Sequence, residues 1–172
     1  MDARKFAASL IGTILVVTAI GTASAQSQSP NRIKQHNAWG AYSYAGNKGK
    51  ICYILSIPTQ KEPADRDHGD VFFMLAKHPG QNVALEPQFQ VGYPFADNSK
   101  VTLEIDGKAF SMFTKENKAW MENPAEEPTV VTSMRAGSKM TVAGESRRGT
   151  KTLYHYSLSG VTKSLAEIQS CQ

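Results

Sequence analysis

Residues 101–112 read VTLEIDGKAFSM, with the dipeptide Asp106-Gly107 at their centre. A two-residue Asp-Gly loop favours a type I′ turn, because both of its central positions need a positive φ angle. The turn predicts an antiparallel hairpin in which Leu103 lies opposite Phe110, with large apolar pairs on one face and mostly polar pairs on the other. Turn chemistry and hydrophobic pattern agree independently, so we expect a hairpin with one buried face.

Short stretches of alternating apolar residues recur on both sides of this hairpin. Residues 51–57 form two alternating sets, which predicts a strand buried mainly on one face. Residues 71–76 are apolar on both faces, as in a central strand. Residues 140–142 and 150–158 predict two late strands joined by a turn over 145–149. Gly, Pro, Asn and Asp separate these stretches, and the whole pattern is typical of a mainly β protein with antiparallel strands.

Two short helices are expected within this β pattern. Pro128 near a start and Gly137 past an end frame a helix over 129–136. Near the C-terminus, Ser164 and Glu167 have the spacing of a capping box, which predicts a second helix beginning there. The inward face of this second helix would carry Leu165, Ile168 and Cys171.

The N-terminus has the pattern of a secretory signal peptide. Arg4 and Lys5 form a positive start, residues 6–20 are an apolar run, and residues 23–25 read ASA, a small-x-small cleavage pattern. A membrane-spanning helix needs about 20 apolar residues, which is more than this run supplies. We therefore expect cleavage after Ala25 and export of the remaining chain.

The expected organisation is a signal peptide over 1–25, a polar and flexible leader over 26–37, and one β domain over 38–172. The exported part has 147 residues, which is enough for a single core. It contains 17 of the 19 basic and 14 of the 15 acidic residues, a net charge of +3 without a basic block. This mild excess does not indicate nucleic-acid binding. No second apolar stretch of spanning length follows the leader, so no transmembrane segment is expected in the mature chain.

The two cysteines, Cys52 and Cys171, both belong to the exported part. An even count in an oxidising compartment predicts a disulfide bond. In the chain-entropy model, closing a loop of about 120 residues stabilises the fold by somewhat under 5 kcal/mol. The alternative is a reactive thiol, which would normally show a C-x-x-C pair or a histidine partner in its sequence context. Neither is visible, and the disulfide is the better interpretation.

Two polar turns contain side chains that could carry chemistry. Residues 65–70 read DRDHGD, but the twelfth position of a calcium loop that starts there is Ala76 instead of glutamate. A solvated turn is the simpler interpretation, with a metal site as the alternative. Residues 144–149 read GESRRG and lack the second glycine of a nucleophile elbow, because Arg148 takes its place. We interpret them as a hairpin turn that exposes Arg147 and Arg148.

Tyr154, His155 and Tyr156 lie in a predicted strand, where neighbours point to opposite faces. Both tyrosines are therefore expected in the core, away from the histidine. The four histidines of the chain show no pair at metal-ligand spacing, and no phosphate-binding loop is present. The sequence thus predicts no catalytic residue, no metal and no cofactor.

A series of aromatic, glycine and cysteine positions follows in a fixed order from Trp39 to the C-terminus. The series consists of Trp39, Ile51-Cys52-Tyr53, Gly92-Tyr93-Pro94-Phe95, Ile105-Asp106-Gly107-Lys108 with Phe110, Ala119-Trp120, Ser146-x-Arg148-Gly149-Thr150, Tyr156-Ser157-Leu158-x-Gly160 and Cys171. In order and spacing, with a signal peptide in front, this series resembles the invasion-associated locus B family of alphaproteobacterial exported proteins.

The resemblance implies an immunoglobulin-like antiparallel β-sandwich with one or two short helices. It also implies a periplasmic, outer-membrane-associated or secreted location and, in pathogens, a part in entering host cells and hence in virulence. It implies no catalytic residue and no cofactor. Some relatives carry an additional pair of cysteines in the middle of the domain, where this chain has other residues, among them Phe113 and Trp120. Only the bond between Cys52 and Cys171 therefore carries over.

These observations favour a non-enzymatic envelope protein that binds an envelope component or a host protein, since sandwich domains commonly work through their edges and loops. A periplasmic small-ligand or metal-binding protein is the alternative. A hydrolase is a third class, disfavoured because no set of acid, base and nucleophile can be assembled.

The candidate partner-binding residues are Tyr93, Phe95, Trp120, Arg147 and Arg148. The three aromatic residues lie beside turns or strand ends, and such side chains are favoured both in cores and in binding hot spots. We expect at least one of the three to be exposed and to form a partner-binding surface with the two arginines.

We predict that the mature protein begins at Gln26, because the cleavage pattern ends at Ala25. N-terminal sequencing and intact-mass measurement of the periplasmic and culture fractions should both report this start. A membrane-embedded species that retains Met1 would contradict the prediction.

Overall fold

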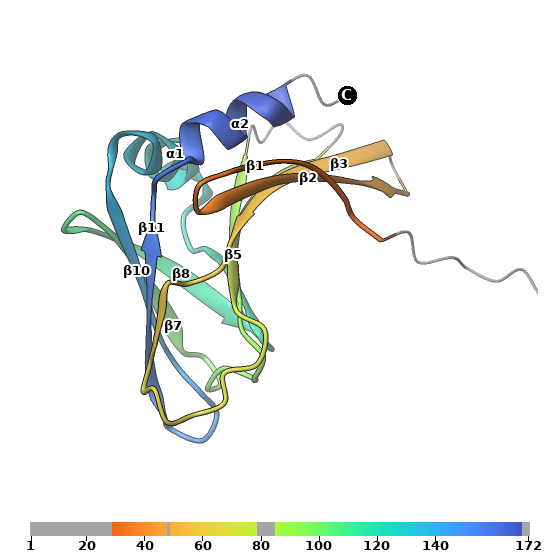
Figure 1. The fold of residues 1–172 in the computed structure, drawn as a ribbon. Coiled ribbons are helices and arrows are strands. Elements are labelled where there is room, and N and C mark those ends of the chain that lie inside the picture. The colour runs from red at the N-terminus through yellow and green to blue at the C-terminus, as the bar shows by residue number, and fades with distance from the viewer. Residues whose placement is uncertain (1–28, 48, 79–84, 170–172) are drawn as a thin grey trace, which may run out of the picture.

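The computed structural model describes residues 29–47, 49–78 and 85–169, and these residues form a mainly β fold with short helices (Figure 1). The strands are β1 (Asn31–His36), β2 (Trp39–Gly46), β3 (Gly49–Ser56), β4 (Gln60–Glu62), β5 (Phe72–Lys77), β6 (Glu86–Gln90), β7 (Lys100–Ile105), β8 (Lys108–Lys115), β9 (Lys118–Met121), β10 (Lys139–Glu145) and β11 (Lys151–Ser157). The helices are a 3₁₀ turn η1 (Pro124–Glu126), α1 (Glu127–Ala136) and α2 (Val161–Gln169). The mainly β class is confirmed.

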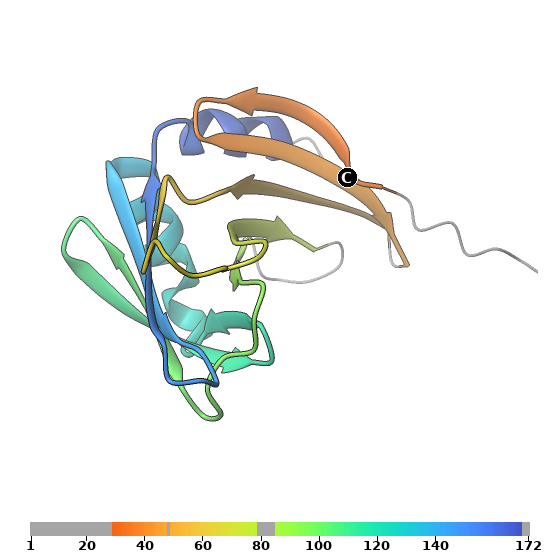
Figure 2. The same cartoon turned by 60° about the horizontal axis from the view of Figure 1, so that its bottom comes forward.

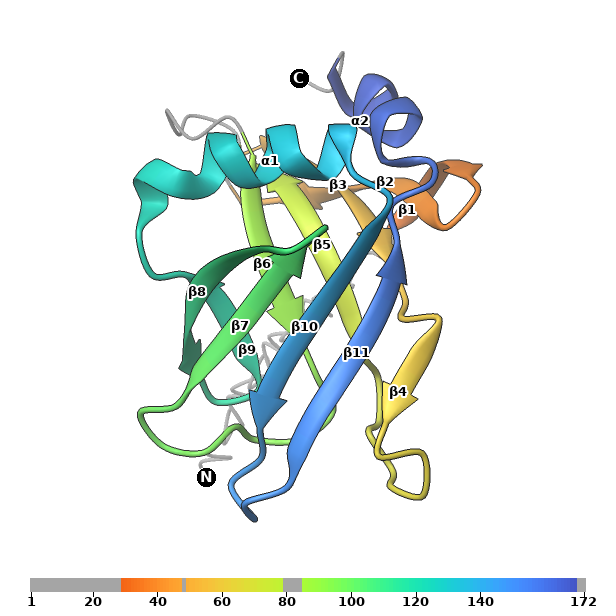
Figure 3. The same ribbon diagram turned by 90° about the vertical axis from the view of Figure 1, so that its left-hand side faces the viewer.

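The strands form one antiparallel sheet in the order β1-β2-β3-β5-β6-β9-β8-β7-β10-β11-β4. This sheet folds over into two layers, and Figure 3 shows β7, β8, β10 and β11 in front of β5 and β6. β4 follows β3 in the chain but pairs with β11 at the other end of the strand order. The connection from β3 to β5 therefore crosses from one layer to the other. The two-layer arrangement is the expected sandwich.

The hairpin at Asp106-Gly107 has the predicted register. Leu103 pairs with Phe110, and all the large apolar side chains on its inner face are buried. The φ angles of Asp106 and Gly107 are 45° and 88°, as the tight turn requires. The Asp106 carboxylate also accepts hydrogen bonds from the backbone nitrogens of Ser138 (2.8 Å) and Lys139 (3.0 Å). The turn thus joins the hairpin to the start of β10, which the sequence pattern did not reveal.

The other predicted strands are present. β5 lies between β3 and β6, which confirms a central position, and β10 pairs with β11 across the expected turn. In β3 the buried face carries Cys52, Ile54 and Ser56, whereas Ile57 beyond its end is exposed. Tyr154 is fully buried, as predicted.

Large aromatic rings fill the space between the layers. Phe89 lies 6.5 Å from Phe73, 6.1 Å from Phe95 and 5.4 Å from Tyr154 between ring centroids. All four rings are buried, and each such side chain contributes a large apolar area. Helix α1 crosses one end of the sandwich (Figure 3), and its buried Val130 and Met134 complete the core there. This helix confirms the one predicted over 129–136.

Helix α2 corrects a prediction about its start. It begins at Val161, so Ser164 lies inside the helix and cannot cap it, and the predicted capping box is wrong. The buried Ser164 hydroxyl donates a hydrogen bond to the Trp39 carbonyl at 2.9 Å. The carboxylate of Glu167 lies 2.8 Å from Nε2 of His36, and this hydrogen bond lowers the pKa of Glu167. Both side chains bind the helix to β1 and β2, beside which it lies in Figure 2.

The leader prediction for residues 26–37 is wrong over Asn31–His36, which form the edge strand β1. Nearly all side chains of β1 are exposed, and the pairing with β2 shifts register between Arg32 and Lys34. Hydrophobic periodicity could not reveal this strand, because backbone hydrogen bonds hold it and it contributes no side chain to the buried core. No helix in the described ranges is long and apolar enough to span a membrane.

Cys171 lies outside the described residues, so its bond to Cys52 stays a prediction. The described end of α2 is compatible with it: Nζ of Lys77 donates to the carbonyl of Gln169 at 3.2 Å, and Lys77 is the register partner of Cys52. Cys52 itself is buried on the inner face of β3.

We predict that the oxidised protein contains no free thiol. Thiol titration in denaturant should find two thiols only after reduction, because one bond joins Cys52 to Cys171. The double variant C52S/C171S should unfold at a lower urea concentration, with a loss of a few kcal/mol that the chain-entropy model limits to about 5 kcal/mol. Two titratable thiols in the native, non-reduced protein would contradict the bond.

Candidate functional site

A pocket of about 650 Å³ is the strongest candidate for a functional site. The β10–β11 turn supplies part of its lining. Figures 1 and 3 show this turn at the end of the sandwich away from α1. The pocket lining consists of Asp65, Arg66, Asp67, His68, Gly92, Tyr93, Pro94, Ser146, Arg147, Arg148, Thr150 and Thr152. Three chain segments supply these residues: the loop between β4 and β5, the link from β6 to β7, and the β10–β11 turn with the start of β11.

Backbone contacts hold the three segments together. The amide of Gly92 donates to the carbonyl of His68 at 3.0 Å, and the amide of Arg147 donates to the carbonyl of Pro94 at 3.0 Å. A Cβ atom on Gly92 would lie 2.6 Å from the Cα of Gly69, so this approach of two backbones requires glycine. The pocket walls are therefore fixed relative to one another before any ligand binds.

A chain of hydrogen bonds runs from the pocket wall into the core. The Tyr93 hydroxyl lies 2.7 Å from the Thr152 hydroxyl and 2.8 Å from the Tyr154 hydroxyl. The Tyr154 hydroxyl lies 2.8 Å from Nδ1 of His68, and Nε2 of His68 lies 2.9 Å from the Pro63 carbonyl. Four side chains from all three segments thus share one network.

The direction of the protons in this network follows from its end. The Pro63 carbonyl can only accept, so Nε2 of His68 carries a proton. In the neutral imidazole, Nδ1 then accepts from Tyr154, whose oxygen accepts from Tyr93. The single proton of Tyr93 is therefore used inside the protein. A ligand meets the Tyr93 ring and not a hydroxyl donor.

Burial raises the pKa of both phenols in the network. For Tyr154 the hydrogen bond to Tyr93 raises the pKa further, and for Tyr93 the hydrogen bonds to Thr152 and Tyr154 partly oppose the increase. Both phenols consequently stay neutral across the physiological pH range, and the network keeps its protons.

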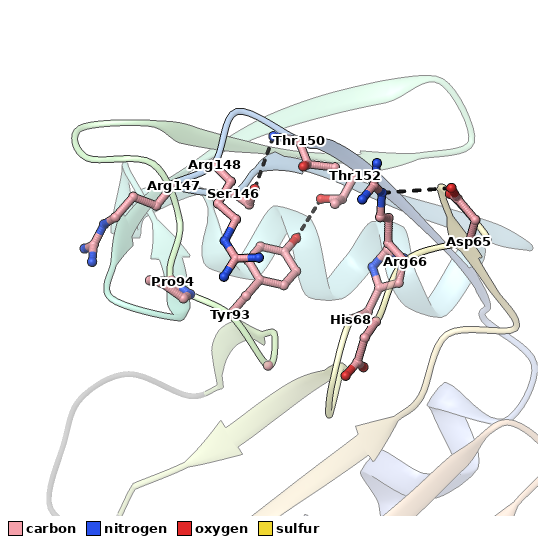
Figure 4. Close-up of a pocket in the computed structure, with 12 residues that line it drawn as sticks. Asp65, Arg66, His68, Tyr93, Pro94, Ser146, Arg147, Arg148, Thr150 and Thr152 are labelled. Carbon is pink, nitrogen blue, oxygen red and sulfur yellow. Dashed lines mark hydrogen bonds and ion pairs between the residues drawn. The ribbon is translucent and has the colours of Figure 1, made fainter.

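The two arginines of the β10–β11 turn differ in direction. Figure 4 shows Arg147 extending away from Tyr93 and Arg148 extending toward it. Nη2 of Arg147 lies 3.2 Å from Oδ1 of Asp97, outside the pocket lining. Arg148 has no ion-pair partner in the described part of the chain. Only one of the two guanidinium groups is thus directed at the pocket and uncompensated.

The structure brings together three of the five candidate partner-binding residues: Tyr93, Arg147 and Arg148 line the same pocket. Phe95 is only 2% exposed, and its ring contacts the Tyr93 ring edge-on from the core. This corrects the prediction that Phe95 belongs to a partner-binding surface. Trp120 stacks on Phe113 on the outer face of β8 and β9 and does not line the pocket.

Sequence reasoning missed the opposite wall of the pocket. Residues 65–70 were expected to form a solvated turn, but His68 is only 5% exposed and its ring packs edge-on against Tyr154. A contact between residues 86 positions apart leaves no local pattern in the sequence. The signal available in the sequence was Gly69, because glycine is favoured where the backbone has a positive φ or approaches another backbone closely. Its φ is 58°, and it contacts Gly92.

The side chains of the pocket differ in how far they are free to contact a ligand. Both nitrogens of His68 are engaged with Pro63 and Tyr154, so this imidazole is not available as a base toward a ligand. Within the described ranges, no three His, Cys, Asp or Glu side chains lie close enough to hold a metal ion together. Rings, hydroxyl groups, guanidinium groups and the carboxylates of Asp65 and Asp67 are what a ligand would contact.

Comparisons with known proteins agree with the resemblance noted in the sequence. The family model for the invasion associated locus B (IalB) protein matches residues 39–169. A crystal structure of invasion associated protein B from Bartonella henselae has a similar fold, with a TM-score of 0.57 and 14% sequence identity. The similarity covers 78% of this chain and 94% of that one. No curated protein sequence matches the chain significantly.

We predict that Tyr154→Phe lowers the free energy of unfolding by about 1–3 kcal/mol. The change removes the hydroxyl that joins His68 to Tyr93 and leaves buried polar groups without a partner. Urea denaturation measures the loss. Tyr44→Phe on the exposed part of β2 is the matched control and should change stability by less than about 0.5 kcal/mol. Equal effects of the two substitutions would show that the network does not stabilise the fold.

Proposed function

Since the chain belongs to the invasion-associated locus B family, we propose that it is an exported cell-envelope protein that binds a protein or another envelope component without catalysing a reaction. The observation that carries this proposal is the pocket between three loops at one end of a rigid sandwich. Loops held by a rigid scaffold are the usual place for binding residues in such domains.

Two features of the pocket support binding over catalysis. The imidazole of His68 is held by partners on both sides, and Ser146 uses its hydroxyl oxygen to accept a hydrogen bond from the amide of Thr150. In the described part of the chain these two side chains share no hydrogen bond, which a base and nucleophile pair would need. The rings of Tyr93 and Pro94 instead offer contact area beside the Arg148 guanidinium.

We further propose where this binding takes place. The predicted signal peptide supports a periplasmic, outer-membrane-associated or secreted location. The structural relative from Bartonella henselae is named an invasion associated protein, and for this protein we propose the corresponding setting, a contribution to host-cell invasion and virulence when the source is a pathogen.

A small-ligand-binding protein is the second candidate function. The pocket volume of about 650 Å³ supports it, because small-molecule sites usually measure about 300–1,000 Å³. Native mass spectrometry of the purified protein distinguishes the two. A retained small molecule would favour the second candidate.

We predict that a photo-crosslinking amino acid at Thr150 captures a partner in intact cell envelopes. Thr150 lines the pocket, so a bound partner lies within reach of the probe. The same probe at Arg135, on an exposed position of α1, is the matched control and should give no discrete product. Gel electrophoresis and mass spectrometry identify the product, and excess unlabelled protein should abolish it. Absence of any product at Thr150, or equal products at both positions, would contradict binding through the pocket.

A further inference from the structure

Two arginines face the pocket without a strong acidic partner. Arg148 has no ion pair in the described ranges, and Nε of Arg66 lies 4.0 Å from Oδ2 of Asp65. The Arg66 and Asp65 side chains are 66% and 78% exposed, and an ion pair this exposed to solvent contributes little to stability. Both guanidinium groups can therefore reorient toward a ligand without losing a strong ion pair.

The two arginines come from different walls. Arg148 belongs to the β10–β11 turn and Arg66 to the loop between β4 and β5, and Figure 4 shows the Tyr93 ring between them. The hydrogen bonds of Tyr93 and the backbone contacts at Gly92 fix this ring. A ligand group that enters between the two arginines thus contacts the Tyr93 ring and can accept hydrogen bonds from both guanidinium groups.

The charges around the pocket favour one negative charge over two. Asp65 and Asp67 line the same pocket and would repel a second negative charge on the group that binds between the arginines. A carboxylate carries one charge, and its two oxygens match the paired donors of a guanidinium. A volume of about 650 Å³ also accommodates several side chains of a peptide, which is more than a free anion fills.

We propose that the pocket recognises an acidic segment of a protein partner, an inference that rests on the proposed binding function. A glutamate or aspartate carboxylate of that segment binds between Arg148 and Arg66, and its neighbours pack on the rings of Tyr93 and Pro94. The net charge of the exported part, +3, would favour the approach of such a segment.

Fluorescence anisotropy with a labelled peptide of alternating glutamate and glycine tests this assignment on the mature, oxidised protein. The matched probe has glutamine in place of glutamate and should not bind. Arg148→Gln and Arg66→Gln should each weaken binding of the glutamate peptide by roughly tenfold or more, because each removes a hydrogen bond between charged groups.

Arg147→Gln is the matched control, since this neighbour has the same charge but is directed at Asp97. It should weaken binding less than about threefold, as expected for an exposed charge at the pocket rim that is paired with Asp97. Equal losses for Arg147→Gln and Arg148→Gln would overturn the proposal, because they would indicate general attraction to a basic turn. Equal binding of the glutamine peptide would overturn it as well.

Competition separates a carboxylate site from a phosphate site. Acetate should displace the peptide at a lower concentration than inorganic phosphate at matched ionic strength, and the reverse order would overturn the carboxylate assignment. Should an arginine variant fail to fold, an NMR titration of the unmodified protein replaces it. The glutamate peptide should then shift the amide signals of residues 66, 93, 148 and 150 but not those of α1, and shifts confined to other residues would refute the site.

The crosslinking experiment at Thr150 keeps the two proposals distinguishable. A partner captured there by a protein that does not bind the glutamate peptide would refute the acidic segment and leave the binding function standing. Failure of the capture itself would refute the binding function.

Discussion

The hydroxyl of Tyr154 is the group on which the candidate site depends. Its ring lies fully buried between the two layers, where a phenol without a hydrogen-bond partner would be costly. The hydroxyl meets this need through His68 at 2.8 Å and Tyr93 at 2.8 Å. These two residues come from different loops, so satisfying one buried hydroxyl fixes two of the three segments that line the pocket. The same hydrogen bonds therefore satisfy the core and hold the pocket, so a substitution in one is expected to affect the other.

The sheet topology explains why the loops meet at all. β4 follows β3 in the chain but pairs with β11 in the other layer, and this crossing carries residues 65–70 to the end of the sandwich that holds the β10–β11 turn. There the loop contacts Gly92 backbone to backbone. At the opposite end, α1 completes the core, whereas at the loop end the side chains of three segments line the pocket.

Local rules account for the parts of the fold that were predicted correctly. Asp106-Gly107 specifies a tight turn, and the alternation on both sides specifies its register, because a slip of one residue would expose every buried side chain. The same rules failed where local signals were weak or misleading. β1 has almost no buried side chain, and Ser164 resembles a cap but is buried inside α2, where it binds the Trp39 carbonyl. In the site, Tyr93 and Arg148 were found from their types and their positions beside turns, whereas Phe95 of the same motif supports the core.

The sequence by itself determined the mainly β class, the central hairpin, the strand of Tyr154 and the resemblance to the family, because each of these depends on residues close together in the chain. Only the tertiary structure decided that the loop of His68 forms a wall of the pocket and that Arg148 extends toward Tyr93 whereas Arg147 pairs with Asp97. The physical reason is that these relations are contacts between segments far apart in sequence. Such contacts are set by the strand order and by the hydrogen bonds that buried groups require, and neither leaves a periodic pattern along the chain.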